Sequence, residues 1–291
     1  DVLWCRGKEE IGQMISFMKR IFVSIVVMAC MSGGAAIAVQ AYVPSTAAEA
    51  AVLMDVDTGK ILYRVNPSKW VHPASTTKIV TYITALDQGK DKLDEPLQIS
   101  WNAANTEPSS LGIAPGDKLT VREALKGMMV VSGNDAAVAV AETLGGSVEG
   151  FAKMMNEEAV KMGATHSHFI NPNGLTASGH YTTAVDMARM AAYGLKHYPE
   201  FASTVSMTAY NVRYLDGHTK YVTTTNRFLK SGYDGANGVK TGYTMAAGDC
   251  LVASATRNGH TLVVALFNDD NRWEDAPAIL DYGFRRLQTG R

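Results

Sequence analysis

The sequence predicts an α/β sandwich in which one antiparallel sheet packs against helices. Near the start of the chain, apolar runs at 51–55 and 61–65 flank the turn sequence Asp57-Thr58-Gly59-Lys60, as in a β-hairpin. Near the end, apolar runs at 250–256 and 261–267 flank Asn258-Gly259, a strong hairpin turn. The segment between them has mostly helical periodicity. Two terminal hairpins that share one sheet, with a helical block inserted between them, give this fold class.

The predicted helices follow one another through the middle of the chain and at its end. Apolar residues recur at intervals of three and four from Ile79 to Leu86, and later segments repeat this period. Gly145-Gly146 ends one of these helices, and Pro199 follows another. We expect helices over 79–86, 121–128, 136–144, 151–162, 186–196 and 274–284. Since no long Pro- or Ser-rich linker separates them, we expect 42–291 to be a single domain.

The front of the chain is typical of a targeting segment. Met18-Lys19-Arg20 is a short basic start, an apolar stretch at 21–31 follows, and small residues continue to Ala41. This order predicts a secretory signal that is cleaved near Ala41, and therefore an exported protein. Two alternatives stay open: the uncharged stretch could remain as a membrane anchor, or Cys30 could carry a lipid. Residues 1–17 are interpreted as an upstream extension, so 1–41 lie outside the predicted domain.

Composition excludes several classes of protein. Hydrophobic residues make up 46% of the 291 residues and charged residues 19%, which argues against disorder. A near balance of 27 basic and 28 acidic residues argues against a nucleic-acid partner. The cysteines Cys5, Cys30 and Cys250 are too far apart for a zinc ribbon, an iron–sulfur cluster or a disulfide framework. Cys250 lies in an apolar run, so we expect it in the core.

The first candidate catalytic motif is Ser75-Thr76-Thr77-Lys78, at the start of a predicted helix. Residues three apart lie on one helical face, so the Lys78 amine is expected close to the Ser75 hydroxyl. A serine hydroxyl becomes a good nucleophile only when a base removes its proton. Lys78 can be that base if burial or a nearby cation lowers its pKa from ~10.4. Alone, this tetrapeptide is more often an exposed helix start.

The second motif is Ser132-Gly133-Asn134, between two predicted helices. Gly133 permits an unusual backbone geometry, which could aim the Ser132 hydroxyl and the Asn134 amide at one point. Ser132 could then relay a proton to a leaving amine while Asn134 holds a substrate amide. Taken alone, the motif is also typical of a helix-capping turn.

The third motif is Lys240-Thr241-Gly242, on a predicted strand. Lys240 and Thr241 side chains that point into a cleft would bind a carboxylate. The charge of Lys240 could also depress the pKa of Lys78. The backbone N–H groups of Tyr243 and Ser75 could form an oxyanion hole. Taken alone, the motif is also typical of an exposed strand end.

The joint order S-x-x-K, S-x-N, K-T-G is far more specific than any of its parts. It is the active-site signature of penicillin-binding proteins and class A β-lactamases. From about 51 to 284 the chain resembles the low-molecular-mass D-alanyl-D-alanine carboxypeptidases, which are serine peptidases of penicillin-binding type. Further matching stretches are His72-Pro73-Ala74, His168-Phe169, Asn171-Pro172-Asn173-Gly174-Leu175, His180-Tyr181-Thr182-Thr183-Ala184, Asp186-Met187-Ala188 and Leu280-Asp281-Tyr282-Gly283-Phe284.

This resemblance implies a fold, a substrate and a set of roles. The implied fold is the penicillin-recognising, β-lactamase-like sandwich with an all-helical lobe. The implied substrate is the D-Ala-D-Ala end of peptidoglycan stem peptides outside the cytoplasm, with β-lactams as covalent inhibitors and no metal or organic cofactor. The implied roles are nucleophile for Ser75, general base for Lys78, proton relay and substrate binding for Ser132 and Asn134, and carboxylate binding for Lys240 and Thr241.

The chain departs from many relatives at its end. They continue into a β-rich domain and an amphipathic membrane helix, whereas this sequence stops at Arg291. We expect a catalytic domain without a C-terminal β domain, and either a single-domain member or an incomplete sequence would look this way.

Competing functions remain. A class A β-lactamase needs E-x-x-x-N, but no Asn stands four residues after the candidate glutamates Glu142, Glu149, Glu157, Glu158 and Glu200. His166-x-His168 suggests zinc, but E-x-x-H is missing, so we interpret both histidines as loop structure. A non-catalytic penicillin- or peptidoglycan-binding pseudoenzyme and an endopeptidase side activity also stay open.

Overall fold

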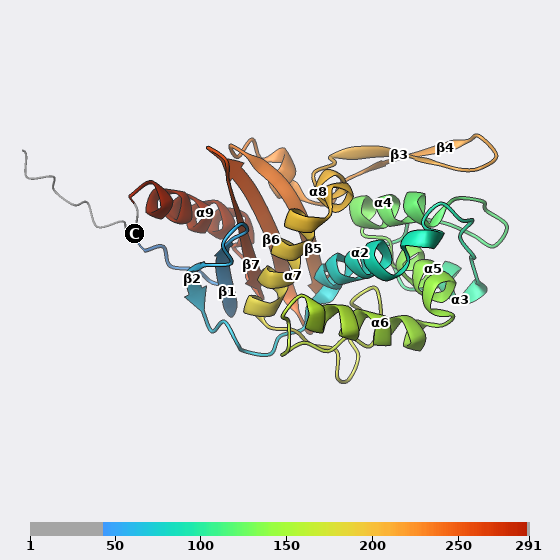
Figure 1. The fold of residues 1–291 in the computed structure, drawn as a ribbon, viewed down its shortest axis with the longest axis horizontal. Helices are drawn as coiled ribbons and strands as arrows, with labels where there is room; N and C mark the ends of the chain where they lie inside the picture. Colours follow the sequence, from blue (N-terminus) through green and yellow to red (C-terminus); the bar gives the residue numbers. More distant parts are fainter. Residues whose placement is uncertain (1–42, 290–291) are drawn as a thin grey trace, which may run out of the picture. The chain divides into compact units, whose positions relative to one another are not determined.

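A five-stranded antiparallel sheet forms the centre of the fold. The computed structural model describes residues 43–289, and Figure 1 shows the sheet between two sets of helices. The strand order is β2-β1-β7-β6-β5. Strand β1 pairs with β7, with Ala50 opposite Phe267, so the two ends of the domain meet in one sheet as predicted. The strands are β1 Ala50–Asp55, β2 Ile61–Val65, β5 Ala236–Thr244, β6 Gly248–Arg257 and β7 His260–Phe267.

Both predicted hairpin turns are confirmed. Asn258 and Gly259 have φ values of 51° and 79°, the left-handed geometry that a tight turn between β6 and β7 requires. In the first hairpin, Gly59 has a φ of 70° just before β2. These turns are local features, and for this reason their residue types alone predicted them.

Helices cover both faces of the sheet. All six residues of β1 are buried, although alternate side chains point to opposite faces. Val52 belongs to the core shared with α7 (Ala184–His197), whereas Leu53 lies against α9 (Arg272–Gln288). A Cβ atom at Gly283 would lie 2.4 Å from Leu53 Cδ2, so glycine permits α9 to pack closely on the sheet. A strand buried on both faces is apolar throughout, as the sequence of β1 is.

The remaining helices pack together beside β5 (Figure 1). The predicted helices are confirmed to within a few residues, and α2 is buried along most of its length. The helices of this lobe are α2 Thr77–Gln88, α3 Trp101–Ala104, α4 Val121–Val131, α5 Asn134–Gly145, α6 Val148–Lys161 and α8 Pro199–Val205. Short 3-10 segments are η1 Ala74–Thr76, η2 Lys90–Lys92 and η3 Arg227–Lys230. The expected sandwich with a helical lobe is therefore the observed fold.

One hairpin was not predicted. The segment after α8, for which no element was expected, forms a hairpin outside the main sheet from β3 (Ala209–Arg213) and β4 (Thr219–Thr223). Its strands are short and largely polar outside, so only Val212 and Val222 are deeply buried. The glycine at position 217, which has a φ of 94° in the turn between β3 and β4, was the sequence feature that could have predicted this hairpin.

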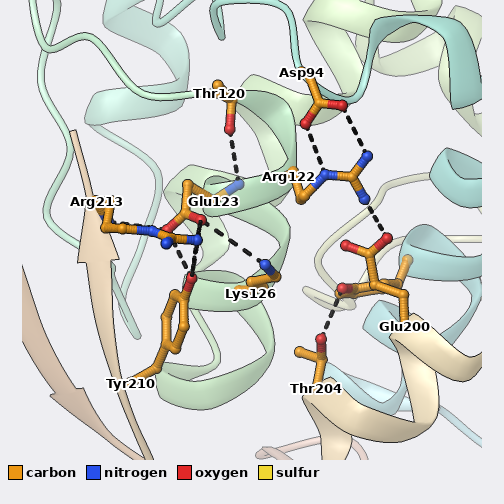
Figure 2. Close-up of polar contacts among 10 residues, drawn as sticks. Asp94, Thr120, Arg122, Glu123, Lys126, Glu200, Thr204, Tyr210 and Arg213 are labelled. Carbon is orange, nitrogen blue, oxygen red and sulfur yellow. Dashed lines mark hydrogen bonds and ion pairs between the residues drawn. The ribbon is translucent and has the colours of Figure 1, made fainter. Parts of the chain in front are cut away.

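Ion pairs and hydrogen bonds fasten this hairpin and α8 to α4 (Figure 2). The buried Glu123 carboxylate accepts hydrogen bonds from the Tyr210 hydroxyl and the Arg213 N–H, each at 2.9 Å. On the other side of α4, Arg122 bridges Asp94 and Glu200. These contacts hold β3 and α8 against α4.

The targeting segment lies outside the described residues. The predicted signal sequence, the cleavage point near Ala41, the anchor alternative and Cys30 all fall within 1–42. Within residues 43–289, no helix has the length and apolar character needed to cross a membrane.

Candidate active site

Ser75 and Lys78 lie where η1 passes into α2. Lys78 Nζ is 3.0 Å from Ser75 Oγ, as the i, i+3 spacing predicted. Ser75 is half-buried and open to a reactant, whereas the Lys78 side chain is completely buried. The hydroxyl and its candidate base are therefore in direct contact, with only the hydroxyl near the surface.

The surroundings of Lys78 favour the neutral form of its amine. Burial lowers the pKa of Lys78 well below its usual value, the charge of Lys240 lowers it further, and Asp135 acts in the opposite direction. Besides Ser75, Nζ contacts Asn134 Oδ1 at 2.6 Å and the Asn173 carbonyl oxygen at 2.7 Å. A neutral amine has two N–H donors and one lone pair. In that form both oxygens, which can only accept, take the two N–H groups, and the lone pair is left for the Ser75 hydroxyl.

The backbone around Ser75 depends on a neighbouring loop. Ala74 has a φ of 47°, which is unusual for a residue with a side chain. Gly174, with a φ of 89°, packs so closely that a Cβ atom there would overlap the Ala74 carbonyl oxygen. Asn173, next to it, contributes the carbonyl that holds Lys78. The sequence analysis gave Asn173 no role, because its contribution comes from the backbone.

His180 supports the same helix start. Its Nδ1 accepts a hydrogen bond from the Ile170 N–H at 3.0 Å, and its Nε2 lies 2.9 Å from Thr77 Oγ1. Burial lowers the pKa of His180 to about 4, so the ring is neutral and donates through Nε2 to Thr77. His180 therefore positions the residue beside Lys78.

Ser132 and Asn134 reach the site from the junction of α4 and α5. Ser132 itself, with a φ of 66°, takes the left-handed geometry that was expected at Gly133. Gly133 has an ordinary φ of −61° and is needed for space, because a Cβ atom there would lie 2.8 Å from the Leu111 nitrogen. The expectation for Gly133 was therefore wrong in its cause, although the turn does aim Ser132 and Asn134 inward.

Lys240 links the second and third motifs. Its buried Nζ donates to Ser132 Oγ at 2.9 Å and to the Thr241 carbonyl oxygen at 2.9 Å. Burial and the charge of Arg272 lower the pKa of Lys240 to about 7. Thr241 Oγ1 lies 3.2 Å from Thr225 Oγ1, which follows strand β4 of the β3–β4 hairpin.

Strand β5 passes directly beside the nucleophile. A Cβ atom at Gly242 would lie 3.1 Å from the Ser75 nitrogen, so glycine lets the strand approach this closely. Tyr243, the next residue, has an exposed fraction of 63%. The predicted oxyanion-hole residues Ser75 and Tyr243 are thus contributed by neighbouring segments of backbone.

Two further expectations can be compared with the structure. Cys250 is buried, as predicted, and burial raises the pKa of its thiol to about 12. His168 Nδ1 lies 2.7 Å from the Gly179 carbonyl oxygen, and His166 Nδ1 lies 3.2 Å from Thr165 Oγ1, which fits loop structure. Among residues 43–289, no cluster of His, Cys, Asp or Glu could hold a metal ion.

A half-buried serine in contact with a buried lysine of lowered pKa, with a second Ser–Lys pair next to it, is the arrangement of a serine hydrolase or acyltransferase that uses lysine as its base. Comparison with known proteins narrows this class. The family model described as D-alanyl-D-alanine carboxypeptidase matches residues 37–271. The chain belongs to the D-alanyl-D-alanine carboxypeptidase family.

Individual relatives agree with this membership. The chain is 40% identical over 251 residues to D-alanyl-D-alanine carboxypeptidase DacF of Bacillus subtilis, covering 83% of this chain and 63% of that protein. It is 34% identical to DacC of Escherichia coli, covering 84% of this chain and 63% of that protein. A mutant of the Streptomyces K15 DD-transpeptidase superposes with a TM-score of 0.79 at 32% identity, covering 84% of this chain and 100% of that one. The chain thus spans about 63% of the length of the first two relatives.

Proposed function

We propose that this protein is a serine D-Ala-D-Ala carboxypeptidase that removes the terminal D-Ala from peptidoglycan stem pentapeptides. One observation carries the proposal: the buried Lys78 amine, whose pKa is lowered, lies 3.0 Å from Ser75 Oγ while the oxygens of Asn134 and Asn173 accept from its N–H groups. In its neutral form this amine can take the Ser75 proton. Family membership then supports the choice of substrate.

Acylation follows from this arrangement. Ser75 Oγ bonds to the carbonyl carbon of the penultimate D-Ala while its proton moves to Lys78 Nζ. The C–N bond to the terminal D-Ala then breaks. Its nitrogen takes a proton through Ser132, and this relay returns Lys78 to the neutral form. The N–H groups of Ser75 and Tyr243 stabilise the oxyanion.

Substrate binding uses the remaining polar groups. The Lys240 ammonium and the Thr241 hydroxyl hold the terminal carboxylate of the substrate. The released D-Ala vacates that position, and neutral Lys78 then activates the water that cleaves the acyl-enzyme. For Asn134 we revise the expected role. Its Oδ1 accepts from Lys78 and its Nδ2 donates to the Glu107 carbonyl oxygen at 2.7 Å, so its main task is to orient the base.

The cellular setting is part of the proposal. Stem peptides lie outside the cytoplasm, so a signal at 18–41 would export the domain to the cell-wall face, and an uncleaved segment would keep it at the membrane. β-Lactams would act as covalent inhibitors at Ser75, because they carry a carboxylate and a reactive amide as the substrate does.

The main alternative is transfer of the acyl group to an amine. It is favoured by one observation, the structural likeness to a protein titled a DD-transpeptidase. A β-lactamase and a non-catalytic binding protein are the other candidates. One experiment separates the carboxypeptidase, the transpeptidase and the binding protein, and the lifetime of the penicillin adduct distinguishes the β-lactamase.

Purified protein is incubated with a stem pentapeptide ending in D-Ala-D-Ala, with and without an amine acceptor, and separately with penicillin. We expect free D-Ala, a covalent penicillin adduct by intact mass, and loss of both in Ser75→Ala. A cross-linked product in the acceptor sample would identify a transpeptidase. Absence of D-Ala and of any adduct would leave a binding protein, and an adduct in Ser75→Ala would remove Ser75 as the nucleophile.

A further inference from the structure

Asp135, directly after the second motif, is a buried carboxylate that holds a loop. Its exposed fraction is 1%. Oδ1 accepts hydrogen bonds from the N–H groups of Leu111 and Ala136, both at 2.8 Å. Oδ2 accepts from the N–H groups of Gly112 at 2.6 Å and Ile113 at 3.2 Å. Three of the four donors belong to residues 111–113, so this one side chain fixes a segment more than twenty residues upstream.

The same loop contacts Asn134. The Asn134 backbone N–H donates to the Ser109 carbonyl oxygen at 2.7 Å, and its side-chain Nδ2 donates to the Glu107 carbonyl oxygen at 2.7 Å. A backbone carbonyl can only accept, so the amide of Asn134 must turn its nitrogen toward Glu107. Its oxygen is then left to face Lys78 Nζ.

This orientation decides what Lys78 can do. If the Glu107 carbonyl moved away, the amide could rotate and present its N–H to the Lys78 nitrogen. The lone pair of Lys78 would then accept from Asn134 instead of from the Ser75 hydroxyl. The ability of Lys78 to act as a base therefore depends on where residues 107–113 are held.

Gly133 supports this interpretation independently. A Cβ atom there would lie 2.8 Å from both the Leu111 nitrogen and Asp135 Oδ1. Because the φ of Gly133 is ordinary, the glycine provides space for this contact and not backbone freedom.

We propose that Asp135 is a positioning residue of the active site. By holding residues 111–113, it keeps the Glu107 carbonyl hydrogen-bonded to Asn134 Nδ2, so that Asn134 Oδ1 faces Lys78 Nζ. The lone pair of neutral Lys78 is then left for the Ser75 hydroxyl. This inference rests on the proposed function, since it concerns the base that activates Ser75.

The test is the rate of acylation by a saturating fluorescent penicillin, whose bound carboxylate keeps Lys240 charged, as a function of pH for wild type and Asp135→Asn. The replacement keeps the shape but places an amide nitrogen opposite backbone N–H groups. We expect the maximum rate, on the plateau above the pKa of Lys78, to fall at least about tenfold. If Asp135 acted only through its charge, the plateau would be unchanged and the ascending limb would move to lower pH, because Asp135 raises the pKa of Lys78. That result would overturn the proposal.

Two further variants separate positioning from general destabilisation. In Gly133→Ala the added Cβ atom would lie 2.8 Å from the Leu111 nitrogen and displace the same loop without removing a charge. This variant should therefore lower the plateau rate of acylation as well. Gly133→Ala also replaces Asp135→Asn in this test if Asp135→Asn does not fold.

Glu123→Gln is the control for general destabilisation. It removes another buried carboxylate, one that holds β3 (Figure 2), and should lower the melting temperature while leaving the plateau rate within about twofold of wild type. Equal plateaus in wild type and Gly133→Ala, or an equal loss in Glu123→Gln, would contradict the proposal. Lack of acylation in wild type would instead refute the proposed function.

Discussion

At the scale of single residues, the proposed base function of Lys78 depends on the contact between its Nζ and Ser75 Oγ. Replacing the amine by a group that cannot lose its proton tests this assignment directly. Lys78→Arg keeps a positive charge, but a guanidinium stays protonated and cannot accept the Ser75 proton. We expect acylation by pentapeptide and by penicillin to fall by at least about a hundredfold. Stopped-flow or quenched labelling measures this rate. Acylation within about tenfold of wild type, an effect of ~1.4 kcal/mol, would show that another group is the base.

The two buried lysines predict a bell-shaped pH profile for kcat/KM. The pKa of Lys78 is lowered, so activity should rise as pH passes through that lowered value. Lys240 has a pKa of about 7 in the free protein, so its ammonium, the proposed partner of the substrate carboxylate, is lost as pH rises through 7. We therefore expect the descending limb near pH 7.

Lys240→Arg checks this assignment. Because a guanidinium keeps its charge, the descending limb should move upward by more than about two pH units, while the ascending limb stays in place. Initial rates of D-Ala release between pH 5 and 10 give both limbs. A descending limb that is unchanged in Lys240→Arg would assign it to a group other than Lys240.

At the scale of elements, the loop that carries Asn173 is built against the turn before Ser75. A Cβ atom at Gly174 would overlap the Ala74 carbonyl oxygen, and its φ of 89° already disfavours a side chain. We expect Gly174→Ala to lower the free energy of unfolding by more than ~3 kcal/mol and to abolish acylation. Urea denaturation and penicillin labelling measure the two effects.

Gly59→Ala is the matched control for this prediction. Gly59 has a φ of 70° in the first hairpin, but no atom lies within 4 Å of a Cβ built there. Only the backbone strain remains, which costs about 1 kcal/mol, and acylation should be unchanged. A similar loss of stability in both variants would mean that strain, and not the contact with Ala74, explains Gly174.

At the scale of the whole molecule, the fate of the penicillin adduct distinguishes a carboxypeptidase from a β-lactamase. After ring opening, the leaving group of penicillin stays attached to the acyl moiety and continues to occupy the site. The sequence has no E-x-x-x-N carboxylate after the second motif to activate a water there. A positioned base contributes about 10²–10⁴-fold, so its absence should make the adduct long-lived compared with the peptide acyl-enzyme.

Intact mass over time, after excess penicillin is removed, follows this adduct. We expect the added mass to persist for many turnovers of the pentapeptide reaction. A rapid return to the unmodified mass, with many penicillins hydrolysed per protein, would favour a β-lactamase instead.

Local chemistry in the sequence determined much of this protein. The two sheet hairpins were predicted because turn residues and apolar runs act over a few positions. The contact between Ser75 and Lys78 was predicted because three residues separate them on one helical face. The β3–β4 hairpin was missed because its strands are short and its stability comes from contacts with α4, such as Tyr210 to Glu123.

Only the tertiary structure decided how the base works. The partners of Lys78 at Asn134 and Asn173 lie 56 and 95 positions away, and the partner of Lys240 at Ser132 lies 108 positions away. One of them is a backbone carbonyl, which every residue type has, so no residue type could have signalled it. The pKa of a lysine depends on water being excluded by the whole fold. Local propensity therefore placed Ser75 beside Lys78, and burial together with long-range hydrogen bonds gave Lys78 the lowered pKa and the contacts that its proposed role as a base requires.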